Sequence, residues 1–184
     1  ERYLASRGIT TWPDHSVYSW TRGGIAFLAR MRDGSPYAVQ VLPLHDDGTK
    51  NRAYWTDGVT KRTYIRAHGW QHFAAVRFPG RGEPILCEGP ETGLSIWLAT
   101  GRPVNACLGI AGIRDLRVGK RLTIARDGDQ PDSPADKTMR STADLRRAQG
   151  QRVRIASPPV GTDFNDVHQR DGLHAVAKMI KGAA

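Results

Sequence analysis

The sequence has few cysteines, no long apolar run and no P-loop motif. Cys87 and Cys107 are the only cysteines among its 184 residues, and a disulfide framework or a zinc site needs more of them at closer spacing. Both fall within predicted buried strands, which indicates core residues in a reducing compartment, so we expect a cytoplasmic protein. No stretch could span a bilayer and no signal-peptide pattern opens the chain, so no membrane partner is expected. P-loop chemistry is disfavoured because Gly119-Lys120 runs into Arg121 and not into Ser or Thr.

The charge balance of the chain is strongly basic. The formal net charge is +9, which favours a polyanionic partner, most commonly nucleic acid. The alternative is that the chain comes from a source whose proteins are basic in general. The net charge alone does not distinguish this from nucleic-acid binding. The length allows one domain, or one domain with a smaller companion. A first residue other than Met suggests a piece of a longer protein or a processed one.

The first part of the chain, residues 1–82, is predicted to form a small, mostly antiparallel α+β subdomain that is a candidate for binding template. Tyr3 to Arg7 suggests a short helix stopped by Gly8. Three apolar runs predict strands, and a hairpin turn signal at residues 33–36 lies between the first two. The predicted strands are Ile25–Met31, Tyr37–Leu42 and Ala74–Phe78.

The second part, residues 83–184, alternates between strand and helix patterns. Such alternation predicts a mainly parallel sheet with helices on both faces. The predicted strands are Ile85–Glu88, Val104–Leu108, Leu122–Ala125 and Val153–Ala156. The predicted helices are Glu91–Thr100, Ser133–Gln149 and, after a cap at Asp171, a last helix from about Leu173 to Ile180. The fold class is therefore α/β, with the antiparallel subdomain in front.

Acidic residues stand at the ends of two of these strands. Glu88 ends the first strand, and Asp127 and Asp129 follow the third. Ligands collect outside the carboxyl ends of the strands in an open α/β sheet, so we expect the three carboxylates around one crevice. Close carboxylates repel one another unless a cation lies between them, and an oxygen-only set suits Mg²⁺ or Mn²⁺. For Asp-Gly-Asp on its own, an ordinary acidic turn is the alternative.

A further acidic group follows the fourth strand. Asp163 is expected to be another metal ligand, whereas Asp166 fits helix capping as well as it fits a site. Phosphate could approach the backbone N–H groups that open the helix after Glu88, although the helix dipole alone also favours Glu91 there. Gly128 would let the chain bend and bring phosphate close to the backbone. The predicted nucleotide-binding residues are Gly89, Glu91, Thr92 and Gly128.

Basic and aromatic residues alternate within the first part of the chain. Such mixtures can stack bases while cations follow the phosphates, although most Trp and Tyr residues simply belong to a core. The predicted nucleic-acid-binding residues are Arg22, Lys61, Arg62 and Arg66.

Three motifs together resemble the Toprim (topoisomerase–primase) domain, in the version found in primases and primase–helicases of phages, plasmids and other mobile elements. They lie at residues 88–95, 125–129 and 161–166. Residues 3–9 and 47–50 also resemble the region that precedes Toprim in these primases. In the family the second motif is usually Ala-Asp-Asn-Asp, so Arg126 and Gly128 depart from it, while both acidic positions are retained.

The resemblance implies the catalytic core of a DNA primase, which synthesises short RNA primers. Glu88 would serve acid–base or metal-linked chemistry, while Asp127 and Asp129 would hold Mg²⁺ or Mn²⁺ against the triphosphate of the incoming nucleotide. Single-stranded DNA template and ribonucleoside triphosphates are the implied partners. A helicase domain or protein is a further implied partner, because such primases often carry a helicase downstream. They often carry a zinc-binding module upstream as well.

Two other functions stay open from the sequence. The unusual Arg126 and Gly128 are compatible with a non-catalytic nucleic-acid-binding Toprim module of a larger replication or conjugation protein. Strand cleavage is the third possibility, since other Toprim proteins are nucleases and topoisomerases, although no tyrosine nucleophile stands out in this sequence.

Overall fold

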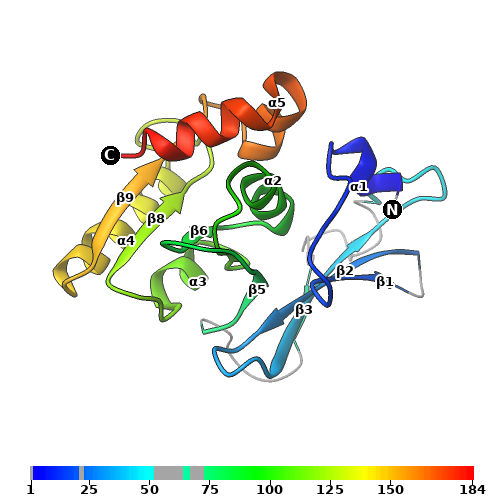
Figure 1. Cartoon of the computed structure of the whole chain (residues 1–184), viewed down its shortest axis with the longest axis horizontal. Coiled ribbons are helices and arrows are strands. Elements are labelled where there is room, and N and C mark those ends of the chain that lie inside the picture. The colour runs from blue at the N-terminus through cyan, green and yellow to red at the C-terminus, as the bar shows by residue number, and fades with distance from the viewer. Residues whose placement is uncertain (1, 21–22, 52–63, 67–72) are drawn as a thin grey trace.

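A computed structural model describes residues 2–20, 23–51, 64–66 and 73–184. Within these residues a nine-stranded sheet runs through both parts of the chain (Figure 1). Its strand order is β4-β3-β2-β5-β7-β6-β8-β9, and β1 pairs with β2 beside this path. The predicted fold class, a parallel α/β sheet preceded by an antiparallel unit, is confirmed.

The N-terminal part of the sheet is antiparallel. Its strands are β1 (Val17–Trp20), β2 (Gly24–Arg30), β3 (Pro36–Pro43) and β4 (Tyr64–Arg66). The predicted turn joins β2 to β3, and the Asp33 carboxylate accepts hydrogen bonds from the backbone N–H and the hydroxyl of Ser35. Helix α1 (Arg2–Ser6) places Tyr3 and Leu4 in the core.

Strand β5 (Ala75–Phe78) joins the two parts of the sheet. It pairs antiparallel with β2 through Ala29 and Arg30 on one side, and antiparallel with β7 on the other. Because the backbone hydrogen bonding continues across this strand, the sheet itself does not mark a break near residue 82. The division into residues 1–82 and 83–184 stays a prediction.

The C-terminal part of the sheet is parallel, in the order β7-β6-β8-β9. These strands are β6 (Ile85–Cys87), β7 (Val104–Ala106), β8 (Arg121–Ala125) and β9 (Arg152–Ala156). Alternate residues face opposite layers, as strand geometry requires. Ile85 and Cys87 therefore pack in one hydrophobic cluster, whereas Leu86 and Ile124 pack in the other.

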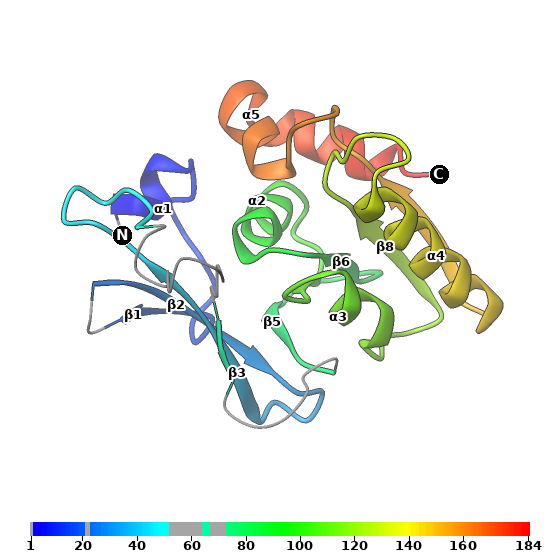
Figure 2. The same ribbon diagram turned by 180° about the vertical axis from the view of Figure 1, so that it is seen from behind.

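Helices cover both faces of the parallel strands. Helices α2 (Pro90–Thr100) and α5 (Phe164–Lys181) contact each other on one face. Helices α3 (Ile110–Asp115) and α4 (Pro134–Ala148) contact each other on the opposite face (Figure 2). Among the described helices, none combines the length and the apolar character that crossing a membrane would need.

The last helix differs from the prediction. Helix α5 begins at Phe164 and not near Leu173, and its N-cap is Asp163. Gly172 interrupts it with φ 82° and ψ 172°, so the predicted helix is only its second half. The helical segment from Phe164 to Asp171 was not predicted, and Asp171, the predicted cap, forms an ion pair with Arg170 at 2.7 Å.

Candidate active site

The predicted acidic residues gather at the carboxyl ends of the parallel strands. Strands β6 and β8 are neighbours, with Leu86 paired to Ile124. Glu88 directly follows β6, and Asp127 and Asp129 lie in the segment that follows β8. Asp163 follows β9 and caps α5. We call this end of the sheet the carboxyl edge.

The carboxyl groups at the carboxyl edge lie close enough to raise one another's pKa values. Burial, followed by the charges of Asp127 and Asp129, raises the pKa of Glu88 to about 7. Burial, followed by the charge of Asp163, raises the pKa of Asp127 to about 6. Burial also raises the pKa of Asp163. Like charges are thus crowded together in a half-buried place, which is a common property of functional sites.

One oxygen at this edge has no hydrogen-bond partner. Oδ1 of Asp127 is buried and accepts no hydrogen bond from any described residue. A buried carboxylate oxygen without a partner costs free energy, and a cation would supply the missing interaction. Carboxylate oxygens are also the donors that Mg²⁺ and Mn²⁺ prefer. The residues at the carboxyl edge therefore fit a hard divalent cation.

The expectation that three or more carboxylates converge on one cation stays a prediction. Among the described residues, no group of three His, Cys, Asp or Glu side chains is placed to hold a metal ion. Mg²⁺ usually keeps several waters and binds through one or two carboxylates together with substrate phosphates. The geometry fits that kind of site better than a cage built from protein alone.

Gly128 locks two loops of the carboxyl edge together. Its N–H donates to the carbonyl of Thr162 at 2.9 Å, and its carbonyl accepts from the N–H of Gly161 at 2.6 Å. A Cβ atom on Gly128 would lie 2.2 Å from the carbonyl oxygen of Pro159, so only glycine fits. The Gly128 N–H is thus already engaged by Thr162, and the predicted phosphate contact of Gly128 stays a prediction. Gly128 holds Asp127 and Asp129 beside the start of α5.

Asp163 and Asp166 form a capping box at the start of α5. The Asp163 carboxylate accepts from the N–H of Asp166 at 2.7 Å, and the Asp166 carboxylate accepts from the N–H of Asp163 at 3.1 Å. Asp166 also forms an ion pair with Arg7 at 3.4 Å. The capping role is therefore real for both residues, and metal binding by Asp163 stays a prediction.

Glu91 binds the N-terminal part of the chain. Its carboxylate accepts a hydrogen bond from the hydroxyl of Tyr3 and lies 2.7 Å from Nζ of Lys50. Burial, followed by the nearby Glu91 charge, raises the pKa of Tyr3 far above its usual value, which keeps the donating hydroxyl protonated. Glu91 thereby fastens α1 and the segment after β3 to the start of α2. Its predicted contact with nucleotide remains untested.

The other two predicted nucleotide-binding residues differ in access. Gly89 is the N-cap of α2, and no described atom lies within 4 Å of where its Cβ would be. Thr92 is 4% exposed and packs inside the protein. Gly89 is therefore the one of the two with open space in front of it.

Comparison with known proteins identifies the family and the fold. The Toprim domain family matches residues 83–174, which is half of the chain. The chain belongs to the Toprim domain family. No relative was found among curated proteins.

Solved primase structures share the fold of the whole chain. The Aquifex aeolicus primase (zinc-binding and RNA polymerase domains) matches with a TM-score of 0.66 at 17% identity, over 100% of this chain and 55% of that one. A DnaG catalytic core matches with a TM-score of 0.62 at 12% identity, over 99% and 71%. A DnaG primase catalytic domain bound to single-stranded DNA matches with a TM-score of 0.58 at 13% identity, over 98% and 57%. The chain thus spans little more than half the length of the first and third of these proteins.

Within this Toprim domain, the unusual Arg126 turns toward α4. Its guanidinium forms a largely buried ion pair with Asp136 at 2.6 Å, and Asp136 also pairs with Arg140 at 2.7 Å. The departure from the family motif therefore has a local explanation, because Arg126 anchors the first turn of α4. Its charge also acts at the carboxyl edge, where it lowers the pKa of Glu88 and of Asp127 against the larger effects that raise them.

The structure gives little information on the predicted nucleic-acid-binding residues. Arg22, Lys61 and Arg62 lie outside the described residues, and Arg66 lies at the end of β4 without a described side chain. Their role stays a prediction.

Sequence reasoning missed the supporting role of three residues beside the carboxyl edge. Asn165 donates to the carbonyl of Arg7 at 2.9 Å and to the hydroxyl of Ser95 at 2.8 Å, and that hydroxyl is 3.1 Å from Nδ1 of His168. This buried network ties α1, α2 and α5 together beside Asp163. Ser95 and Asn165 lie within the motifs at residues 88–95 and 161–166, but nothing in the sequence indicated that they contact each other.

Proposed function

We propose that this Toprim protein is the catalytic core of a DNA primase, which joins ribonucleotides on a single-stranded DNA template. The observation that carries the proposal is the crowding of Glu88, Asp127 and Asp129 at the carboxyl edge of a Toprim sheet. The same sheet continues into a basic antiparallel unit, and the combination has the fold of primase catalytic cores over nearly its whole length.

Each acidic residue has a distinct role in this proposal. Glu88, with a pKa of about 7, can accept a proton from the attacking 3′-hydroxyl near neutral pH. Asp127 and Asp129 would hold Mg²⁺ or Mn²⁺, with Asp163 as a further candidate. The bound cation would neutralise charge on the triphosphate of the incoming nucleotide. Gly128 and the capping box keep these residues positioned before substrate arrives.

Isosteric substitutions at the carboxyl edge test the proposal. Glu88→Gln and Asp127→Asn should each lower template-dependent incorporation of labelled ribonucleotides by about a hundredfold or more, because each removes a charge the reaction uses. Asp144→Asn is the matched control, since Asp144 is 71% exposed on α4 and pairs only with Arg147 among described residues. Thermal unfolding should show that all three variants fold. Full activity in both carboxyl-edge variants would refute the assignment.

A non-catalytic nucleic-acid-binding module is the second candidate, because no ready-made group of three metal ligands is present among the described residues. Calorimetric titration with Mn²⁺ separates the two functions. Catalysis requires Mn²⁺ binding that Asp127→Asn weakens, whereas a non-catalytic module would bind DNA without binding Mn²⁺.

A further inference from the structure

A basic cleft lies at the opposite end of the parallel strands from the acidic residues. Two adjoining cavities, of about 550 and 310 Å³, share Arg32 and Arg117 in their walls. We call them together the arginine cleft. The residues of the cleft that matter here are Arg32, Phe73, Arg77, Asn105 and Arg117.

The location of the arginine cleft separates it from the candidate active site. Pro84, Pro103 and Gly119 line the cleft, and each lies just before a parallel strand, β6, β7 and β8 respectively. The cleft therefore opens at the amino ends of the strands that carry Glu88 and Asp127 at their carboxyl ends. We call this end the amino edge.

The positive charges of the cleft are only partly compensated. Arg77 donates to the carbonyl of Arg30 at 3.3 Å and to Oδ1 of Asn105 at 3.0 Å, but its buried Nη2 has no partner among the described residues. Burial, with the nearby charge of Arg32 also contributing, lowers the pKa of Arg77. No acidic residue is among the described residues that line the cleft. An anion would relieve this repulsion between like charges.

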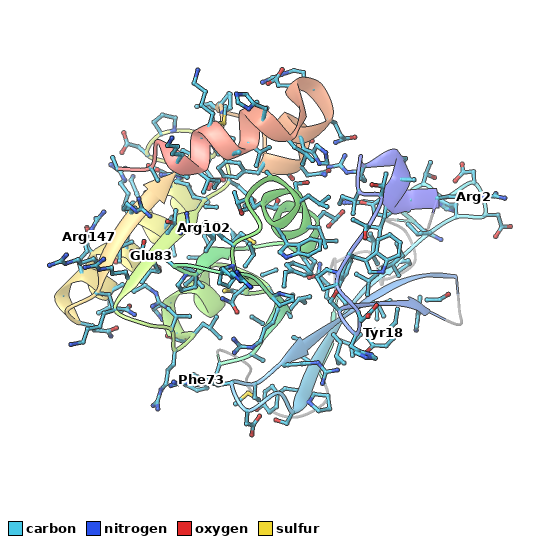
Figure 3. The ribbon with its side chains drawn as sticks, viewed as in Figure 1. Arg2, Tyr18, Phe73, Glu83, Arg102 and Arg147 are labelled. Carbon is cyan, nitrogen blue, oxygen red and sulfur yellow. The ribbon has the colours of Figure 1, made fainter. Side chains whose placement is uncertain are left out.

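An exposed aromatic ring stands at the mouth of the cleft. Phe73 is 47% exposed, at the periphery of the molecule (Figure 3). The guanidinium of Arg117 lies 5.9 Å from the centre of its ring, which is a cation–π distance. A large apolar ring left in solvent beside cations offers a stacking surface next to phosphate-binding groups, and this combination is typical of sites for single-stranded nucleic acid.

A neighbouring basic cavity does not have the same properties. It measures about 560 Å³ and is lined by Glu83 together with four arginines. Glu83 pairs with Arg154 at 2.9 Å and lies 3.7 Å from Arg121, so part of that charge is already neutralised, and no aromatic residue is among its described lining residues. The arginine cleft is the better candidate for a polyanion that carries rings.

We propose that the arginine cleft binds single-stranded nucleic acid, with phosphates at Arg32 and Arg117 and a base stacked on Phe73. An unpaired strand is required because a base inside a duplex cannot present its face to the ring. This second contact goes beyond the proposed reaction, because it needs neither cation nor nucleotide. It would hold a strand at a distance from the carboxyl edge.

Fluorescence anisotropy with a labelled oligothymidylate, in EDTA and without nucleotides, tests the charge part of the proposal. The double variant Arg32→Ala/Arg117→Ala should bind more weakly. The slope of log affinity against log salt concentration should fall by about 1.4, because each phosphate contact contributes about 0.7 for single strands. The matched control Lys137→Ala/Lys178→Ala removes two exposed cations from α4 and α5 and should leave this slope unchanged.

Phe73 tests the stacking part. Phe73→Leu keeps an apolar side chain but removes the ring, and it should weaken binding about fivefold or more. Phe73→Tyr keeps the ring and should bind within about twofold of the original chain. Thermal unfolding of each variant separates loss of binding from loss of folding.

Three results would overturn the proposal. The first is a salt slope that the cleft arginines and the control lysines change equally. The second is a duplex that competes as well as oligothymidylate. The third is unchanged binding in Phe73→Leu together with equal competition by polyglutamate, which would indicate an acidic protein partner. Because Asp127→Asn should retain this binding, a failure of the cleft proposal leaves the proposed primase reaction standing, and the reverse also holds.

Discussion

The two edges of the parallel sheet carry opposite charges. The carboxyl edge crowds Glu88, Asp127 and Asp163 into a half-buried region, where burial raises the pKa of each carboxyl group. The amino edge crowds Arg77 and Arg102, and burial lowers the pKa of both. Each edge therefore holds charges that burial and repulsion make costly, and a ligand of the opposite sign would relieve each of them.

The edges also differ in how firmly they are built. At the carboxyl edge, Gly128 binds the loop after β9 through two backbone hydrogen bonds, and the capping box fixes Asp163 and Asp166. At the amino edge, Gly119 has open space around it, and Arg32 and Arg117 lie on turns and loops. A rigid edge suits chemistry that needs fixed distances, whereas an open edge suits contacts with a flexible strand.

Gly128→Ala should break the carboxyl edge most severely. The new Cβ would lie 2.2 Å from the Pro159 carbonyl oxygen, so the two loops must move apart. We expect a loss of about 2–3 kcal/mol in the free energy of unfolding. Ribonucleotide incorporation should fall about a hundredfold, because small displacements of reacting groups are that costly. Urea unfolding and the incorporation assay measure the two effects.

Gly119→Ala is the matched substitution at the amino edge. No described atom lies within 4 Å of its Cβ position, so the free energy of unfolding should change by no more than about 0.5 kcal/mol. If both glycine variants lost similar stability, the difference in rigidity between the two edges would be wrong.

The next largest difference between the two edges should appear in the pH dependence of stability. The pKa values of Glu88 and Asp127 are raised to about 7 and about 6 in the folded chain. The folded state therefore binds more protons than the unfolded chain between about pH 4 and pH 7, and the free energy of unfolding falls as pH rises through this window. In EDTA, Glu88→Gln should be about 1–3 kcal/mol more stable than the original chain at pH 8, and this advantage should disappear at pH 4.

Glu83→Gln at the amino edge should not raise the free energy of unfolding at pH 8. Glu83 lies among arginines, with Arg154 at 2.9 Å, so neutralising it removes favourable pairs and should not stabilise the chain at pH 8. Urea unfolding at both pH values measures both variants. Equal stabilisation by Glu88→Gln and Glu83→Gln would show that the raised pKa of Glu88 has another origin.

Much of the fold could be predicted because single runs of residues determine it. The apolar runs at residues 85–87 and 122–125 form buried strands as predicted, and Ser133 caps α4 through its own hydroxyl. Helix α3 could not be predicted, because Gly112 weakens its helical pattern. The structure requires glycine at this position, because a Cβ atom on Gly112 would lie 2.0 Å from the carbonyl oxygen of Cys107.

The acidic residues could be located from strand ends alone, but their partners could not. Tyr3 and Glu91 are 88 residues apart in the chain, and no local pattern announces their hydrogen bond. The same holds for the contact between the Phe73 ring and the guanidinium of Arg117. The close packing of Gly128 against Pro159 and Thr162 of the loop after β9 could not be predicted either, because it joins segments that are distant in the sequence.

The smallest expected effect concerns Arg126, whose charge lowers the pKa of Glu88 and Asp127. Arg126→Gln removes a cation that would repel Mn²⁺, so at pH 8 Mn²⁺ should bind about two- to threefold more tightly. At pH 5.5 this gain should vanish, because the two carboxyl groups then have higher pKa values and proton competition offsets it. Asp136 keeps its pair with Arg140, so the variant should fold. Calorimetric titration at both pH values checks this, with Arg102→Gln at the amino edge as control. A gain of equal size at both pH values would show that Arg126 acts on the cation alone and not on protonation of the carboxyl edge.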